Sequence, residues 1–328
     1  MSIKIAVIGT GHLGSIHAKL LKSATANAML CGIYDPDQAR SERLATELWT
    51  HSFKTIEEAF KNSDAVIIAS PTIHHFTIAK QALEAGKHCF IEKPITTSYE
   101  EALELIKIAE EKNLIIQVGH VERFNPSLLA LKDYTIAPLF IEAHRLSQFK
   151  PRATDVSVVL DLMIHDIDIV LWLVNSPVKS IDANGVAVLT ETPDIANARI
   201  TFENGCVANL TASRISAQSM RKMRLFQKNA YISMDFGNST VEVFRLVDED
   251  EVLKESMTPT MMLGNLEAGR TKKSIIFEKP TVPPVNAIAE EQKSFAEAIV
   301  FKTPVAVTAR EAAEALRVAE EIMKFTIQ

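Results

Sequence analysis

Two side chains that can exchange protons, Asp161 and His165, stand four residues apart in the otherwise apolar stretch 158–174. In a helix they lie, together with Asp168, within roughly 60° of one another and form one polar stripe. Burying a carboxylate and an imidazole costs several kcal/mol unless they are paired or line a polar cavity. We therefore expect the stripe to line a reaction site that uses acid–base chemistry. The alternative is a helix whose polar stripe faces solvent.

A glycine-rich loop follows the first apolar run of the chain and leads into a helix-like stretch. The loop consists of Gly9, Thr10, Gly11, His12, Leu13 and Gly14. Glycines in this pattern permit a tight turn and a close approach to a pyrophosphate, and the helix N-terminus supplies amide donors to the phosphates. Asp35 ends the next apolar run, where a carboxylate accepts hydrogen bonds from the ribose and repels a 2′-phosphate. The pattern predicts NAD rather than NADP, although the nearby Arg40 could accommodate that phosphate.

The tripeptide Glu92-Lys93-Pro94 closes the fourth apolar run. If the runs are parallel strands, the tripeptide lies at the carboxyl edge of the sheet, where open α/β sheets bind ligands. Lys93 could donate there to a substrate oxygen, and a bound cofactor could lower its pKa toward neutrality. A solvated lysine at a strand end is the alternative. The other residues expected to contact the cofactor at this edge are Ser70, Pro71, Thr72, His75 and Glu92.

The elements that must position these residues follow two different patterns. Residues 1–120 alternate short apolar runs with amphipathic stretches, which predicts a doubly wound parallel sheet of the Rossmann type. From about residue 139, strand-like segments alternate with short turns such as Glu203-Asn204-Gly205, which predicts an α+β region with a large, mostly antiparallel sheet. The expected strands are 3–10, 29–35, 64–70, 88–93 and 115–119, then 139–147, 178–189, 195–202, 206–213, 230–236 and 239–246.

We therefore expect an α/β protein of two domains. Residues 1–122 would form the NAD(P)-binding domain, and residues 123–328 would form a domain for substrate binding and oligomerisation. The stretch 256–273 has no periodicity and is expected to be a mobile loop. Two helices, at roughly 286–301 and 308–325, close the chain, and the last could pack back on the first domain.

The glycine-rich loop, the Glu-Lys-Pro tripeptide and the Asp-x-x-x-His helix ahead of an antiparallel sheet together resemble the Gfo/Idh/MocA family. This family includes glucose–fructose oxidoreductase, inositol dehydrogenase and related NAD(P)-dependent sugar dehydrogenases, and the resemblance covers essentially the whole chain. It implies that Lys93, Asp161 and His165 surround the reacting carbinol and that the Lys93–Pro94 peptide bond is cis. Many members carry glycines where this chain has residues 157–159 and Met163, which leaves the shape of the substrate pocket open.

Residues 119–126, Gly-His-Val-Glu-Arg-Phe-Asn-Pro, and the string Asp-Leu-Met-Ile-His-Asp-Ile-Asp resemble the subgroup that includes UDP-N-acetylglucosamine 3-dehydrogenases. This resemblance places His120, Arg123 and Asn125 among the candidate substrate contacts. The alternative for this segment is a linker between domains that a salt bridge of Arg123 holds in place.

The resemblance implies an NAD-dependent oxidoreductase that transfers a hydride between nicotinamide and a secondary alcohol of a sugar, nucleotide sugar or cyclitol. His165 would act as general base, Lys93 would stabilise negative charge on the reacting oxygen, and Asp161 would orient the polar pair. Which of His165 and Lys93 moves the proton stays open. The alternatives are a non-catalytic, nicotinamide-binding regulator or redox sensor on the same fold and, third, a structural partner-binding protein.

Composition and charge also exclude some classes of protein. A net charge of −6 over 328 residues gives no basic surface for nucleic acid or an anionic membrane, and no apolar run reaches the ~20 residues of a membrane span. The three cysteines are far apart in apolar runs, as expected of free thiols in the cytoplasm. They are Cys31, Cys89 and Cys206.

Metal binding and assembly are the last two expectations. No metal is expected, because the residues of zinc-binding type near the motifs lack metal-ligand spacing. These are His120, Glu122, His165 and Asp168. A homodimer or homotetramer is expected through the sheet of the second domain, because its strands carry small residues on a face predicted to point outward. Those residues are Ala196, Ala198, Ala208 and Ala212.

Overall fold

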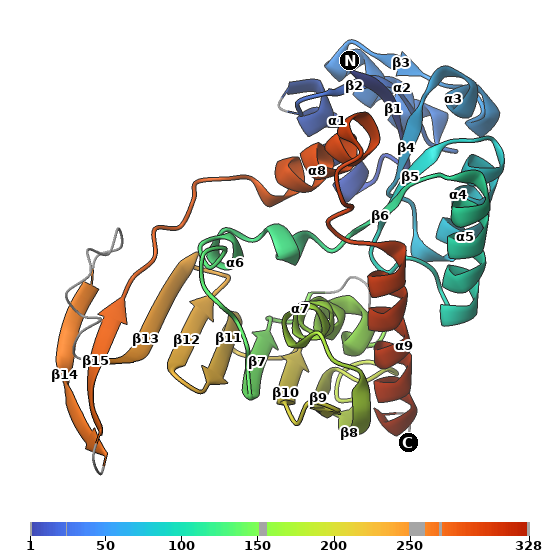
Figure 1. Cartoon of the computed structure of the whole chain (residues 1–328). Helices are drawn as coiled ribbons and strands as arrows, with labels where there is room; N and C mark the ends of the chain where they lie inside the picture. The colour runs from blue at the N-terminus through green and yellow to red at the C-terminus, as the bar shows by residue number, and fades with distance from the viewer. Residues whose placement is uncertain (1, 24, 151–155, 249–259, 269–270, 327–328) are drawn as a thin grey trace. The chain divides into compact units, whose positions relative to one another are not determined.

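The structure, a computed structural model, describes residues 2–23, 25–150, 156–248, 260–268 and 271–326. Its contacts divide the chain into two compact units, whose elements are labelled in Figure 1. Unit 1 comprises Met1–Phe124 and Val285–Arg317, and unit 2 comprises Asn125–Pro284 and Val318–Gln328. This division differs from the expected one in residues 123–124 and 285–317, which the sequence pattern places in the second domain.

Unit 1 is built on a six-stranded parallel sheet with the order β3-β2-β1-β4-β5-β6, which confirms the predicted doubly wound sheet. The order reverses between β1 and β4, the position at which open α/β sheets bind nucleotides. The strands are β1 (Ile3–Ile8), β2 (Ala28–Tyr34), β3 (His51–Ser52), β4 (Ala65–Ile68), β5 (His88–Glu92) and β6 (Ile116–Gly119). The helices are α1 (His12–Ser23), α2 (Gln38–Leu48), α3 (Ile56–Asn62), η1 (Thr72–His74), α4 (His75–Glu84), α5 (Tyr99–Lys112), η2 (Val121–Phe124), α8 (Ala287–Phe301) and the first part of α9 (Ala309–Thr326).

The sheet of unit 1 is buried on both faces, as parallel sheets covered by helices are. All four residues of β4 are buried, for example. Phe295 and Ala296 of α8 belong to the same hydrophobic cluster as Phe90 of β5. This shared core is the physical reason that α8 belongs to unit 1.

Unit 2 contains a nine-stranded sheet with the order β14-β15-β13-β12-β11-β7-β10-β9-β8. Its strands pair antiparallel except for β7 and β10, which pair parallel, so the predicted mostly antiparallel sheet is confirmed. The strands are β7 (Phe140–Leu146), β8 (Val178–Val186), β9 (Ile195–Phe202), β10 (Val207–Ser213), β11 (Met220–Gln227), β12 (Ala230–Asp235), β13 (Thr240–Asp248), β14 (Thr260–Ala268) and β15 (Thr271–Glu278). Its helical elements are α6 (Pro126–Leu129), the π-helical turn η3 (Val159–Met163), α7 (Ile164–Val174) and the last part of α9.

The expectation of a mobile loop over residues 256–273 is wrong for the part that the structure describes. Strands β14 and β15 pair antiparallel, from Thr260 opposite Glu278 to Ala268 opposite Thr271. The register shifts between Met262 and Gly264. This shift breaks the two-residue alternation that reveals a strand in a sequence. Residues 256–259 and 269–270 lie outside the described residues.

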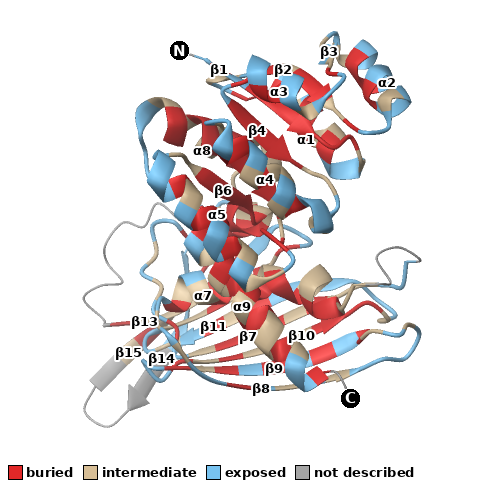
Figure 2. Cartoon of the chain, turned by 90° about the vertical axis from the view of Figure 1, so that its right-hand side faces the viewer, coloured by how far each residue is buried: buried red, intermediate tan, exposed pale blue. Residues whose placement is uncertain are grey.

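The expectation that four alanines of β9 and β10 face outward is also wrong. Ala196, Ala198, Ala208 and Ala212 are at most 1% exposed. The residues between them, such as Asn197 and Arg199, are exposed, because successive side chains of a strand point to opposite faces. Figure 2 shows this alternation of burial along the sheet. The small side chains face inward, where β10 contacts η3 and α7.

Among the residues that the structure describes, no helix has the length and apolarity to cross a membrane.

Candidate active site

The glycine-rich loop joins β1 to α1 at the carboxyl end of β1. Gly9 has a φ of +93°, which L side chains rarely adopt, and a Cβ there would come within 2.8 Å of the carbonyl oxygen of Ala69. A Cβ on Gly14 would lie 1.9 Å from the carbonyl oxygen of Gly9. A Cβ on Gly11, in contrast, would meet nothing within 4 Å. The turn itself therefore requires the first and third glycines, whereas the second leaves open space beside the N-terminus of α1.

Asp35, the residue after β2, is held against this loop. Its Oδ2 accepts hydrogen bonds from the backbone N–H of Thr10 at 2.7 Å and from the Thr10 hydroxyl at 2.8 Å, and its Oδ1 accepts from the N–H of Asp37 at 2.9 Å. A carboxylate has about four acceptor sites, so at least one remains for a ligand. Asp35 is therefore fixed in place and can still accept from a ribose hydroxyl.

A cavity of about 570 Å³ opens beside the loop. Its lining residues are Thr10, Gly11, His12, Ser15, Ile16, Lys19 and Arg40. The N-terminus of α1 contributes amide donors, and Lys19 and Arg40 contribute positive charge, which together favour phosphate groups. The residues present therefore fit the pyrophosphate of a dinucleotide.

The ends of β4 and β5 are joined through the buried imidazole of His75. Its Nε2 lies 2.9 Å from the carbonyl oxygen of Ser70, and its Nδ1 lies 2.9 Å from the carbonyl oxygen of Pro94. Burial, which outweighs the effect of these two oxygens, holds the pKa of His75 below its ordinary value. Ser70 leads from β4 through the exposed Pro71 to the half-buried Thr72. His75 thus ties together the two loops that sequence analysis assigns to the cofactor.

The side chains of Glu92 and Lys93 in the Glu-Lys-Pro tripeptide differ in their burial. Glu92 is buried, where its Oε1 lies 2.6 Å from Nε2 of His17, and its Oε2 accepts from the backbone N–H of Lys93 at 3.3 Å. Lys93 is half-buried. The Lys93–Pro94 peptide bond is cis, which confirms the expectation from the family resemblance.

Two of the three candidate substrate-binding residues in segment 119–126 form contacts within their own unit. Nη1 of Arg123 forms a 2.8 Å ion pair with Glu311, although the Arg123 side chain is only 4% exposed. Asn125 caps α6, because its Oδ1 accepts from the N–H of Ser127 at 3.0 Å. The structure therefore shows the salt bridge that sequence analysis gave as the alternative for Arg123. His120 is buried in unit 1.

In unit 2, Asp161 and His165 lie on the segment that runs from η3 into α7. The expected regular α-helix over 158–174 is wrong for its first turn, because residues 159–163 form a π-helical turn. Such turns are frequent at functional sites. Asp161 and His165 are half-buried, whereas Asp168 is only 1% exposed. The accessible part of the predicted polar stripe therefore comprises Asp161 and His165.

A buried ion pair fixes α7 against the sheet directly beside His165. Nε and Nη2 of Arg145, on β7, donate to the two carboxylate oxygens of Asp166 at 2.9 and 2.8 Å. Both side chains are only 5% exposed. The pair could not be predicted from the sequence, because its partners lie 21 residues apart and neither has a local signal.

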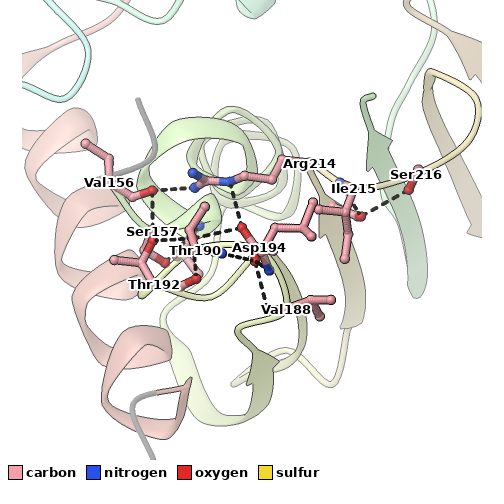
Figure 3. A network of polar contacts seen from close by, with 12 residues as sticks. Val156, Ser157, Val188, Thr190, Thr192, Asp194, Arg214, Ile215 and Ser216 are labelled. Carbon is pink, nitrogen blue, oxygen red and sulfur yellow. Dashed lines mark hydrogen bonds and ion pairs between the residues drawn. The ribbon is translucent and has the colours of Figure 1, made fainter. Parts of the chain in front are cut away.

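A second polar network holds the chain just before η3 (Figure 3). Oδ2 of Asp194 accepts from the backbone N–H groups of Val188, Leu189 and Thr190 at 2.8, 2.6 and 3.0 Å. Burial by itself raises the pKa of Asp194, but these donors and the Thr190 hydroxyl outweigh it, so the pKa lies below its ordinary value. Asp194 is therefore an ionised group in the interior of unit 2.

Arg214 links this carboxylate to the segment that leads into η3. Its Nε lies 3.9 Å from Oδ1 of Asp194, and its Nη2 donates to the carbonyl oxygen of Val156. The N–H of Val158 donates to the carbonyl oxygen of Pro193 at 3.1 Å. The network thus anchors the backbone three residues before Asp161.

The described residues contain one group of three side chains of metal-binding type. They are His17, Glu92 and Glu291, whose ligand atoms lie within 4.8 Å of one another. The 2.6 Å separation of His17 and Glu92 is that of a strong hydrogen bond. The sequence led to an expectation for Glu92, as a cofactor contact, but to none for His17 or Glu291.

Comparison with protein families gives two matches that together span most of the chain. Residues 3–120 match the family described as an oxidoreductase family with an NAD-binding Rossmann fold, GFO_IDH_MocA. Residues 138–233 match the GFO/IDH/MocA C-terminal domain.

Individual relatives give the same assignment. The chain is 41% identical over 243 residues to a UDP-N-acetylglucosamine 3-dehydrogenase of Acidithiobacillus ferrooxidans, covering 74% of this chain and 77% of that relative. It is 31% identical to a scyllo-inositol 2-dehydrogenase (NAD(+)) of Bacillus subtilis, covering 65% and 68% of the two chains.

Solved structures share the fold over the whole chain. A crystal form of the Acidithiobacillus ferrooxidans UDP-N-acetylglucosamine 3-dehydrogenase superposes with a TM-score of 0.87 at 34% identity, covering 100% of this chain and 98% of that one. A scyllo-inositol dehydrogenase of Lactobacillus casei with bound NAD(H) and scyllo-inositol gives a TM-score of 0.76 at 22% identity, covering 99% and 97% of the two chains, and so shares the fold.

Proposed function

The chain belongs to the GFO/IDH/MocA oxidoreductase family, and we propose that it oxidises the C3 hydroxyl of UDP-N-acetylglucosamine with NAD as the hydride acceptor. The chain is an NAD-dependent dehydrogenase. The proposal concerns its substrate. The observation that carries it is the 41% identity to an enzyme of that name, which exceeds the 31% identity to an inositol dehydrogenase.

The cofactor side of the proposal rests on unit 1. When bound, NAD supplies a nicotinamide ring that accepts a hydride. The N-terminus of α1 and the space beside Gly11 would hold the pyrophosphate, and Asp35 would accept from the ribose hydroxyls. A 2′-phosphate would meet the negative charge of Asp35, which supports NAD over NADP.

The chemical side of the proposal assigns three residues. Lys93 would donate a hydrogen bond to the reacting oxygen and stabilise its negative charge, and His165 would take the hydroxyl proton. Asp161 would orient this polar pair. These roles follow from the family resemblance, from the half-buried positions of all three side chains, and from the ion pair of Asp166 that fixes α7 beside His165.

We also propose a homo-oligomer that forms through the sheet of unit 2, on the face opposite the buried alanines. A row of aromatic rings crosses that face on five strands that are neighbours in the sheet, with ring centroids 4.9–5.8 Å apart. The row consists of Phe140, Phe226, Tyr231, Phe244 and Phe277. An aromatic row on an open sheet face is suited to burial against a second subunit.

A reducing compartment such as the cytoplasm is part of the same proposal. Cys31, Cys89 and Cys206 are free. Burial raises the pKa of Cys31 and of Cys206 to about 11, so these thiols stay protonated and slow to oxidise.

The substrate is tested by following NADH formation with a panel of alcohols. The panel contains UDP-N-acetylglucosamine, UDP-glucose, free N-acetylglucosamine, scyllo-inositol and myo-inositol. We expect turnover with UDP-N-acetylglucosamine to exceed that with every other compound by at least about tenfold in kcat/KM. Preferred turnover of an inositol would contradict the substrate and leave the dehydrogenase assignment intact.

A further inference from the structure

A buried polar cluster lies beneath the Glu-Lys-Pro tripeptide in unit 1. It consists of His17 of α1, Glu92 of β5 and Glu291 of α8, which are 0%, 7% and 1% exposed. One polar side-chain atom of each residue lies within 4.8 Å of those of the other two. The negative charge of two carboxyl groups so close together in the interior must be neutralised by protons or balanced by cations.

Gln292 determines where the proton of His17 lies. Its Nε2 donates to the backbone carbonyl oxygen of His17 at 3.1 Å and faces Nδ1 of the ring at 2.8 Å, while its Oε1 accepts from the Thr25 hydroxyl at 2.7 Å. Rotating the amide would turn its oxygen toward the carbonyl oxygen of His17. Nδ1 is therefore an acceptor, and the ring proton lies on Nε2 and is donated to Glu92 at 2.6 Å. His17 is neutral in this arrangement and does not compensate the carboxylates.

Glu291 lacks donors for its carboxylate. Within the described residues, neither of its carboxyl oxygens has a hydrogen-bond partner, and neither does Oε1 of Gln117. The two residues are adjacent, because Nε2 of Gln117 donates to the backbone carbonyl oxygen of Glu291 at 2.8 Å. An ionised Glu291 would leave these acceptors without a donor, whereas a protonated Glu291 carries an O–H group that can donate to a neighbouring acceptor.

The titratable side chains on the elements packed against α8 include Glu122 and Arg123 on η2, besides the cluster members His17 on α1 and Glu92 on β5. The guanidinium of Arg123 is engaged by Glu311 at 2.8 Å. Burial, followed by repulsion from Glu92, raises the pKa of Glu291 well above its ordinary value.

We propose that Glu291 is a neutral carboxylic acid in the folded protein and that Glu92 is the ionised carboxylate of this buried cluster. Glu291 is then a positioning residue that acts through Glu92. Its proton keeps a second negative charge away from Glu92, which accepts from the backbone N–H of Lys93. The protonation of Glu291 does not depend on the proposed substrate.

Infrared spectroscopy tests the protonation directly. At about neutral pH the purified wild-type protein should show the C=O stretch of a buried, protonated carboxylic acid, and the band should be absent in Glu291→Gln. Glu290→Gln is the matched control, because Glu290 is the preceding residue and lies 3.7 Å from Lys293 at the surface of α8. The control should retain the band. A wild-type spectrum without such a band would overturn the proposal.

Stability measured against pH provides a second test. A carboxyl group whose pKa is raised by folding contributes stability below its unfolded pKa, near 4.3, and loses that contribution as pH rises through its folded pKa. Glu291→Gln cannot ionise at this position. The Tm of the variant should therefore rise relative to the Tm of the wild type as pH rises from about 5 to about 9. Glu290→Gln should stay parallel to the wild type. Equal pH dependence of Glu291→Gln and the wild type would contradict the proposal.

A bound metal is the competing explanation for the same cluster. The proposal predicts less than about 0.1 equivalent of transition metal in the purified protein by elemental analysis. One equivalent of metal that is lost in Glu291→Gln would overturn the neutral acid and make the cluster a metal site.

Discussion

The backbone N–H and the hydroxyl of Thr10 both donate to one carboxylate oxygen of Asp35, at 2.7 and 2.8 Å. The two residues belong to the turns after β1 and β2, so this contact joins the glycine-rich loop to the next strand end. Asp35 is thereby a fixed negative charge beside the cavity that fits the dinucleotide. The selectivity of the enzyme between NAD and NADP should depend on that charge.

Wild-type enzyme should bind NAD at least about tenfold more tightly than NADP, which corresponds to ~1.4 kcal/mol. Asp35→Asn should narrow this ratio, because asparagine still accepts from Thr10 but does not repel a 2′-phosphate. Calorimetric titration of each nucleotide gives both dissociation constants. Glu111→Gln, which removes a negative charge at an exposed position of α5, serves as the control. Equal or tighter NADP binding by the wild type would contradict the prediction and direct attention to Arg40.

Lys93→Met and His165→Ala should each slow hydride transfer by ~10²-fold or more, the usual effect of removing a positioned acid–base group. Affinity for NAD should barely change, because the cofactor contacts that we propose lie in the loop and at Asp35. The double variant should lose less than the product of the two single losses, because in the proposed reaction both side chains act on one oxygen. Single-turnover kinetics with UDP-N-acetylglucosamine measures these rates. Lys107→Met, at an exposed position of α5, is the control.

Two results would contradict these assignments. Near-normal turnover of either variant would remove that residue from the chemistry. A large loss of NAD binding would make the residue structural instead.

The cofactor half of the site could be predicted from sequence because its signals are local. The loop from Gly9 to Gly14 is one turn between a strand and a helix, and backbone geometry alone requires two of its glycines. The same local character allowed the parallel sheet to be predicted, whereas the cis bond at Pro94 was expected from the family resemblance.

Features that depend on distant partners could not be predicted. Arg145 and Asp166 are 21 residues apart, and His17 and Glu291 come from opposite ends of the chain, so no window of sequence contains either group. Strand β11 carries several charged residues and was not identified, because its buried positions are limited to Met223 and Leu225.

The error over the alanines of β9 has a different origin. Ala196 and Ala198 alternate with Asn197 and Arg199, and the polar residues mark the outward face. The small size of these side chains led to the expectation that they lie on an outward face at a subunit interface. In the structure it accompanies close contact between β10 and the helical segment inside unit 2.

Asp194→Asn should destabilise unit 2 by about 3 kcal/mol near neutral pH, because it leaves Arg214 buried without its opposing charge. A carboxylate whose pKa is lowered by folding contributes stability above its unfolded pKa, near 3.9, and loses it as pH falls through the folded pKa. The difference between wild type and variant should therefore shrink as pH falls from about 7 to about 3. Urea unfolding across this range measures the difference, and Asp182→Asn, on the exposed side of β8, is the control. A difference independent of pH would show that the charge of Asp194 is not what stabilises the network.

Phe226→Glu should reduce the molecular mass in solution, because Phe226 is 37% exposed and stands within the aromatic row proposed to meet a second subunit. Light scattering at micromolar concentration gives the mass. Phe301→Glu is the control, because Phe301 is 58% exposed but belongs to α8 of unit 1. A monomeric wild type would contradict the proposed assembly, and an unchanged mass of Phe226→Glu would move the interface elsewhere.

The most direct test of the proposed reaction follows a deuterium label from the substrate. UDP-N-acetylglucosamine that carries deuterium at C3 is incubated with the enzyme and NAD, and the reduced nicotinamide is analysed by mass spectrometry. The account predicts transfer of the label to the nicotinamide, a slower single turnover than with unlabelled substrate, and no transfer from substrate labelled at C4. Reduction of NAD by labelled UDP-N-acetylglucosamine without transfer of the C3 label would contradict the account. So would a failure of UDP-N-acetylglucosamine to reduce NAD under conditions in which an inositol reduces it.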